Sequence, residues 1–172
     1  MMRRFAGVVV ATLALIGAGC WLVAASPAGA ATPSSAKGSP ITGKPPLQVV
    51  ATAPKGSLHN PYTGNAAMAA AGHKLFFNYG CNGCHGGGGG GGMCPPLING
   101  VWIYGGDDDT LFRLVSLGSD KLAAAGYYRQ TIENVVAPMP SMGPLIKSDS
   151  DLWKIITWIR SAYDGPPGHQ YK

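Results

Sequence analysis

Apolar residues recur at three- and four-residue steps in three separate stretches of the chain. This spacing places them on one face of a helix, so it predicts three α-helices. In the first stretch Met68, Leu75 and Phe76 follow this period, with Gly72 among them, and we expect close contact with another helix at that glycine. The three predicted helices cover residues 65–79, 110–117 and 151–163.

The ends of these helices carry the expected signals. Gly80 and Gly118 directly follow the first two helices, and glycine is common just past a helix C-terminus. Asp109 is the expected N-cap of the second helix. Ser148 and Asp151 resemble a capping box at the start of the third.

Strand patterns are scarce. The best is the short run over residues 100–104, Gly-Val-Trp-Ile-Tyr. An insertion over residues 119–136 contains a possible helical turn at 121–126, followed by the aromatic and basic residues 127–129. Such residues are favoured in binding sites, so we expect this insertion to cover a cofactor edge or to recognise a partner. The pattern as a whole predicts a mainly α domain.

The first thirty residues have the pattern of a signal peptide. Basic residues at 3 and 4 precede an apolar run over 5–25, and Ala28-Gly29-Ala30 offers a cleavage site before Ala31. Export of the mature chain to the periplasm is the expectation. The alternative is an uncleaved membrane anchor, since the run is long enough to cross a bilayer.

Composition divides the remainder of the chain into three parts. Residues 31–58 are rich in Pro, Ala and Ser and are expected to form a flexible tail. Residues 59–163 are expected to form one folded domain, and residues 164–172 an irregular C-terminal tail. A domain of this size has a thin core, which a buried cofactor would complete.

Charge does not indicate a nucleic-acid partner. The chain carries 13 Lys and Arg against 8 Asp and Glu, a formal net charge of +5. Removal of Arg3 and Arg4 with the signal peptide lowers this charge to +3. No cluster of basic residues interleaved with aromatics is present in the sequence, as a single-stranded binding groove would require.

Cys81-Asn82-Gly83-Cys84-His85 is the motif that points to a chemistry. C-x-x-C-H is the attachment signature of c-type haem, in which two thiols hold the porphyrin and the histidine ligates iron. A thioredoxin-like redox pair would need a βαβ setting. A zinc site would need a second pair of ligands, and the remaining cysteines are Cys20 and Cys94.

Beyond this motif, the chain resembles class I cytochromes c over residues 60–163. The resemblance rests on Gly72-x-x-Leu75-Phe76 before the haem motif, on Cys94-Pro95-Pro96-Leu97, and on a terminal helix with Trp153 and Trp158. It implies helices packed around one covalent haem c, held by Cys81 and Cys84. It also implies that the Pro95 carbonyl orients His85. Cys94 departs from the family's glycine at this position.

The resemblance further implies a methionine as the second axial ligand of the iron. In Met139-Pro140-Ser141-Met142-Gly143, the first methionine matches the family's Met-Pro-x-aromatic-Gly pattern. Met139 is therefore the expected ligand, and Met142 is expected to pack at the haem edge. A bis-histidine site with His73 is the less favoured alternative.

A narrower resemblance links the chain to cytochromes that serve quinoprotein (PQQ-dependent) methanol or alcohol dehydrogenases, the cytochrome c-L type. It rests on residues 60–65, on the glycine-rich stretch before Pro95, and on residues 102–107. It implies an electron carrier, not an enzyme, that passes electrons to a downstream cytochrome or oxidase. The alternatives are a general periplasmic carrier and a small haem enzyme or sensor with an open sixth position.

Three further features lie outside these motifs. Asp107, Asp108 and Asp109 could ligate Ca²⁺, but helix capping explains them without a metal, and the sequence does not support a calcium site. The glycines at 86–92 are expected to form a flexible loop at the haem edge. Cys94 is expected to be a buried, inert thiol, or otherwise to pair between chains.

Overall fold

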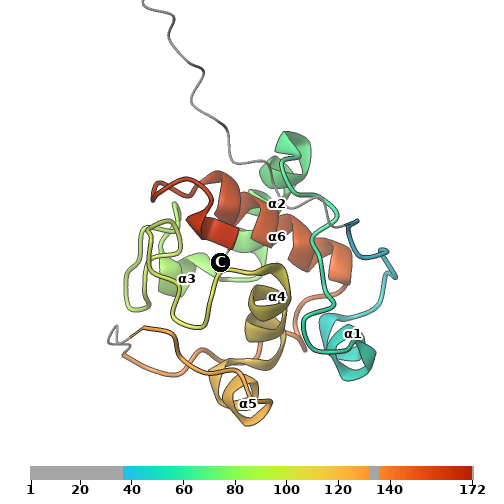
Figure 1. Ribbon diagram of the computed structural model, residues 1–172. Helices are drawn as coiled ribbons and strands as arrows, with labels where there is room; N and C mark the ends of the chain where they lie inside the picture. Colours follow the sequence, from blue (N-terminus) through green and yellow to red (C-terminus); the bar gives the residue numbers. More distant parts are fainter. Residues whose placement is uncertain (1–36, 132–135, 172) are drawn as a thin grey trace, which may run out of the picture.

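The computed structural model describes residues 37–131 and 136–171, which form helices joined by long loops (Figure 1). Within these ranges there is no strand, so the mainly α prediction is confirmed. The elements are α1 (Pro46–Thr52), α2 (Ala66–Asn78), α3 (Asn82–His85), α4 (Asp108–Leu117), α5 (Ser119–Ala124), α6 (Asp149–Ser161) and a 3₁₀ turn, η1 (His169–Tyr171).

The best strand candidate in the sequence, residues 100–104, does not form a strand. These residues form an irregular loop with bends. A strand satisfies its backbone groups only by pairing with a neighbouring strand, and the described residues offer none. The signal peptide expected at residues 1–30 lies outside the described residues. No helix in the described part of the chain has both the length and the apolar character needed to cross a membrane.

The crossing of α2 and α6 is the centre of the fold, and these two helices share the largest helix–helix contact (Figure 1). Gly72 is buried at the crossing, where an added Cβ would lie 1.9 Å from the Lys154 carbonyl oxygen. The close contact expected at this glycine is therefore confirmed. Beside it, α4 adds Phe112, whose ring centroid lies 4.4 Å from that of Trp153 on α6.

Side chains cap the three long helices. Asn65 and Ser148 accept hydrogen bonds from the backbone N–H groups of Met68 and Asp151, as the sequence predicts for α6. On α4 the prediction is wrong by two residues, because the N-cap is Asp107, whose side chain accepts a hydrogen bond from the Thr110 N–H. Asp109 is instead turned into the protein, where it pairs with a buried arginine.

The flexible tail expected over residues 31–58 is wrong for its described part, residues 37–58. Pro46 starts the short helix α1 and is buried. Val49 and Val50 pack against the core, and Leu58 belongs to it. A seven-residue helix has too few turns to show a hydrophobic period, so the sequence did not reveal it.

Asp149, at the start of α6, attaches this N-terminal segment to the domain. Its buried carboxylate accepts hydrogen bonds from the Thr42 N–H and hydroxyl, both at 2.7 Å, and from the Gly43 N–H at 3.0 Å. Residues 164–171 also lie against the domain: the Asp164 N–H donates to the Ile98 carbonyl at 2.8 Å. This C-terminal part is irregular as expected, apart from η1.

Candidate haem site

The C-x-x-C-H motif lies on a tight turn at the end of α2. Gly80 has a φ of +74°, a conformation that favours glycine, and it turns the chain out of the helix. The Cys81 N–H donates back to the Phe76 carbonyl at 3.0 Å, and the His85 N–H donates to the Cys81 carbonyl at 3.0 Å. The two thiols and the imidazole therefore come from one compact helical turn.

The His85 ring is held by Pro95. Its Nδ1 lies 2.9 Å from the Pro95 carbonyl oxygen, the contact expected from the sequence. Because a carbonyl only accepts, Nδ1 must carry the proton, and Nε2 keeps its lone pair for a metal. Burial lowers the pKa of His85, although the bond to Pro95 opposes this shift. The neutral ring, the form that ligates iron, is thereby favoured.

The glycine run folds back on itself between His85 and Pro95. The Gly91 N–H donates to the His85 carbonyl at 2.9 Å, and the Leu97 N–H donates to the Gly89 carbonyl at 2.8 Å. An added Cβ on Gly86 would lie 2.6 Å from the Gly91 carbonyl oxygen. Glycine thus permits a close backbone approach that brings residues 94–97 against the histidine.

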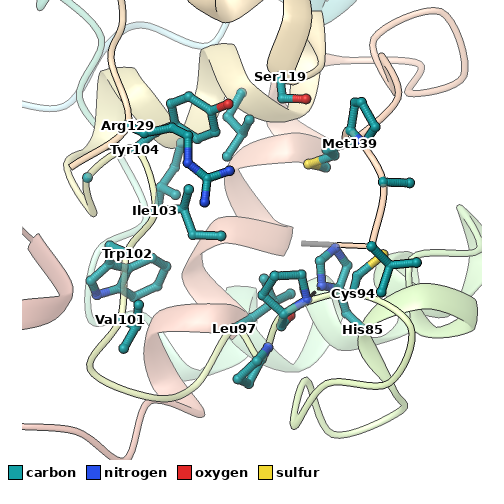
Figure 2. Close-up of a pocket in the computed structure, with 18 of the residues that line it drawn as sticks. His85, Cys94, Leu97, Val101, Trp102, Ile103, Tyr104, Ser119, Arg129 and Met139 are labelled. Atoms are coloured by element: carbon teal, nitrogen blue, oxygen red, sulfur yellow. Dashed lines mark hydrogen bonds between the residues drawn. The ribbon is translucent and has the colours of Figure 1, made fainter. Parts of the chain in front are cut away.

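A cavity of about 330 Å³ opens in front of the His85 ring (Figure 2). This volume lies within the usual range of cofactor pockets. Its wall is mostly apolar, and these wall residues come from the connection between α3 and α4 and from α4: Leu97, Trp102, Ile103, Tyr104, Leu111 and Leu114. The loop at residues 100–104 therefore forms one side of the cavity, a role that its sequence did not indicate.

Met139 lies across this cavity from His85, and Figure 2 shows its sulfur directed into the space. The α4–α5 turn positions it, because the Ser119 N–H donates to the Met139 carbonyl at 3.0 Å. Gly118 allows this approach, since an added Cβ there would lie 2.6 Å from the same oxygen.

The other candidate ligands lie elsewhere. Met142 packs against the hydrophobic core and does not line the cavity. His73 stacks on Trp158 at a centroid distance of 4.5 Å, and its Nε2 lies 3.0 Å from the Gly87 carbonyl. Of these side chains, the structure brings only Met139 to the cavity with His85.

The two thiols of the motif are not among the residues that line the cavity. Cys81 and Cys84 are half-buried on the turn beside it, and Cys81 packs against the core. Burial raises the pKa of the Cys81 thiol, and the nearby Cys84 raises it further, against a lowering by backbone hydrogen bonding. Cys94 is half-buried near Cys84, so the full burial expected for this thiol is wrong.

These residues fit a covalently attached haem. The site offers two thiols, an imidazole with a free Nε2 and a thioether on the far side of an apolar space. The Ser119 hydroxyl is buried at the cavity wall, and no described residue hydrogen-bonds to it. A bound group with oxygen atoms could satisfy this hydroxyl.

The sequence matches the profile of the cytochrome c family over residues 69–162. The chain therefore belongs to the cytochrome c family, whose members bind haem c covalently and transfer electrons. The motif and its flanking residues predicted this membership.

One similar solved structure is that of cytochrome cL from the marine methylotrophic bacterium Methylophaga aminisulfidivorans. The two sequences are 24% identical, and the two structures superpose with a TM-score of 0.45. The match covers 60% of this chain and 59% of that one. No curated protein sequence matches this chain.

Proposed function

We propose that this chain is a periplasmic electron carrier for a quinoprotein (PQQ-dependent) methanol or alcohol dehydrogenase. It would accept single electrons from that enzyme and pass them to a downstream cytochrome c or oxidase. The observation that carries the proposal is the placement of His85 and Met139 on opposite sides of an apolar cavity. A histidine–methionine pair is the ligand set of electron-carrying cytochromes, because the thioether favours Fe(II).

The chain's own residues would hold the cofactor and limit its exposure to water. Cys81 and Cys84 would attach it, Pro95 fixes the orientation of His85, and the Met139 backbone is fixed by the α4–α5 turn. Haem c, when bound, supplies an iron centre that gains or loses one electron. An apolar surround such as this one excludes water, which is one way in which a protein sets a haem potential.

Exposed apolar side chains at the mouth of the cavity support a docking role for this face. Val101 and Val136 line the cavity and are 38% and 83% exposed. Tyr128, on the loop that follows α5, is 78% exposed and directly precedes Arg129, which lines the cavity. A small apolar patch suits the brief, weak contact that is typical of redox partners.

The partner is assigned from the sequence resemblance to cytochromes that serve quinoprotein dehydrogenases. The proposed experiment is stopped-flow mixing of the oxidised, haem-loaded protein with a reduced methanol dehydrogenase, followed by haem absorbance. Fast reduction is the expected result. Tyr128→Ser should lower the second-order rate constant, whereas Leu145→Ser, at an exposed apolar residue outside the cavity, should leave it unchanged.

Two other outcomes would change the proposal, the first in its partner and the second in the class of protein. If a small chemical reductant reduces the haem readily and the dehydrogenase does not, the chain is a general carrier. If the haem binds added ligands as readily as an open iron site does, the carrier proposal fails in favour of a haem enzyme or sensor.

The periplasmic location is part of the proposal and rests on the pattern of residues 1–30. The intact mass of the exported protein tests it, with a mature chain that begins at Ala31 as the expected result. Replacement of Leu13 and Leu15 by arginine should keep the chain in the cytoplasm without attached haem. Recovery of full-length chain in the membrane fraction would show an uncleaved anchor instead.

A further inference from the structure

A third thiol lies against the haem-attachment motif. Burial and the neighbouring Cys84 thiol raise the pKa of the Cys94 thiol, so the two thiols lie near enough to interact. The backbones of the same two residues are also joined, because the Cys94 N–H donates to the Cys84 carbonyl at 3.1 Å. The two residues are therefore neighbours in both their backbones and their side chains.

The glycine loop maintains this approach. The Gly92 N–H donates to the Cys94 carbonyl at 3.1 Å, and an added Cβ on Gly92 would lie 3.0 Å from the Cys84 carbonyl oxygen. A loop of nine residues separates the two cysteines, so the entropic cost of closing it is small. A disulfide requires the backbones of its two cysteines to be close, and the hydrogen bond between Cys94 and Cys84 keeps them adjacent.

Cys81 is placed differently. It packs against the hydrophobic core, and its carbonyl accepts a hydrogen bond from the Cys84 N–H at 3.3 Å within the same helical turn. Cys84 therefore has two possible sulfur partners, Cys81 on its own turn and Cys94 on the loop that folds back against it.

We propose that Cys84 and Cys94 form an intramolecular disulfide in the haem-free chain, and that this bond withholds Cys84 from haem attachment until it is reduced. A small-molecule or protein disulfide is the oxidant: the two thiols lose two electrons and two protons, and the disulfide donor becomes two thiols. Alternatively, the Cys94 thiolate attacks an existing Cys81–Cys84 disulfide at Cys84 and releases Cys81 as a thiolate.

The bond must be reduced before the cofactor can be attached. A dithiol reductant returns two electrons and two protons to Cys84 and Cys94. Cys84 can then form its thioether, while Cys94 remains a free thiol.

Cleavage at Met93 allows a direct test, because this residue separates Cys94 from the other two thiols. The full chain is expressed with its signal peptide, and free thiols are alkylated at harvest. The haem-free fraction is then treated with cyanogen bromide under non-reducing conditions. A disulfide to Cys94 keeps fragments 69–93 and 94–139 linked, and reduction separates them.

Variants identify the partner within the first fragment. The link should persist in Cys81→Ala, where Cys84 is the one remaining thiol of fragment 69–93, and it should be lost in Cys84→Ala and Cys94→Ala. Separate fragments in both the unaltered chain and Cys81→Ala would overturn the proposal. A link that persists in Cys84→Ala would also overturn it, by assigning the bond to Cys81.

The effect on haem attachment is measured separately. Intact mass gives the fraction of chains that carry haem. In the unaltered chain this fraction should rise when a thiol reductant is added during maturation. Cys94→Ser, which keeps the size of the side chain, should depend less on the reductant, because only a Cys81–Cys84 disulfide can then withhold Cys84. An equal dependence in the two chains would contradict a blocking role for Cys94.

Discussion

The backbone of Gly72 on α2 lies directly against the Lys154 carbonyl on α6. An added Cβ at Gly72 would lie 1.9 Å from that oxygen, a separation that no real contact allows. This approach fixes how the two longest helices cross. Since α2 leads directly into the turn that carries Cys81 and His85, the crossing also sets where the haem motif lies relative to the core.

Gly72→Ala should therefore destabilise the protein strongly. The methyl group meets backbone atoms, which cannot rotate away, so we expect a loss at or above the upper end of the roughly 1–3 kcal/mol typical of overpacking. Chemical denaturation of the haem-loaded protein measures it. Gly88→Ala is the matched control, because an added Cβ there meets no atom within 4 Å. Equal stability of the two variants would contradict this account of the crossing.

A buried cluster joins α4 to two neighbouring segments. Asp109 is 3% exposed and accepts hydrogen bonds from Arg113 at 2.9 Å and from the Tyr127 hydroxyl. Arg113 also donates to the Ala53 and Pro54 carbonyls, both at 2.8 Å. One carboxylate thus links the end of the N-terminal segment, helix α4 and the insertion after α5.

This cluster should make stability depend on acid pH. Burial alone would raise the pKa of Asp109, but the hydrogen bonds from Arg113 and Tyr127 outweigh it, and the net shift is downward. A lowered native pKa gives stability that is complete above the unfolded-state value of about 4 and is lost as pH falls through the native value. The free energy of unfolding should therefore fall on acidification, in part because Asp109 becomes protonated.

Asp109→Asn tests this contribution. At neutral pH the variant should lose about 3–5 kcal/mol, because it leaves the Arg113 charge buried without its partner. The difference between variant and unaltered protein should shrink as pH falls below about 4. Asp120→Asn, at an exposed position on α5, is the control and should show neither effect. A difference that stays constant with pH would argue against the titration of Asp109.

Tyr127 attaches the insertion to the same carboxylate, and burial together with Asp109 raises the pKa of its phenol. Tyr127→Phe should cost roughly 1.5–3 kcal/mol, the usual value of a hydrogen bond to a charged group. It should also speed tryptic cleavage after Arg129 by freeing the segment. Tyr128→Phe is the adjacent control, since that side chain is 78% exposed. Equal cleavage rates in the two variants would show that the bond does not hold the insertion.

The features predicted most accurately from the sequence are those with a local signal. Helix α2, its buried glycine and the bond between His85 and Pro95 all follow from short motifs in which neighbouring residues determine the result. The family assignment followed for the same reason, because several such motifs occur in the expected order.

Features that depend on distant contacts were predicted less well. Helix α1 is stabilised by packing on the core, and the segment before it by Asp149, more than a hundred residues away. Asp107 and Asp109 are two residues apart and both acidic, so the choice of N-cap depended on Arg113 and Tyr127, which draw Asp109 inward. The contact between Cys94 and Cys84 depends on how the glycine loop folds.

The central claim is that His85 and Met139 hold the haem iron from opposite sides. It is tested most directly by the absorption spectrum of the oxidised, haem-loaded protein, in which a methionine–iron charge-transfer band reports the thioether ligand. The account predicts that Met139→Ala abolishes this band. It predicts that Met142→Ala retains the band and lowers only the free energy of unfolding, because Met142 packs on the core. Loss of the band in Met142→Ala, with its retention in Met139→Ala, would contradict the account.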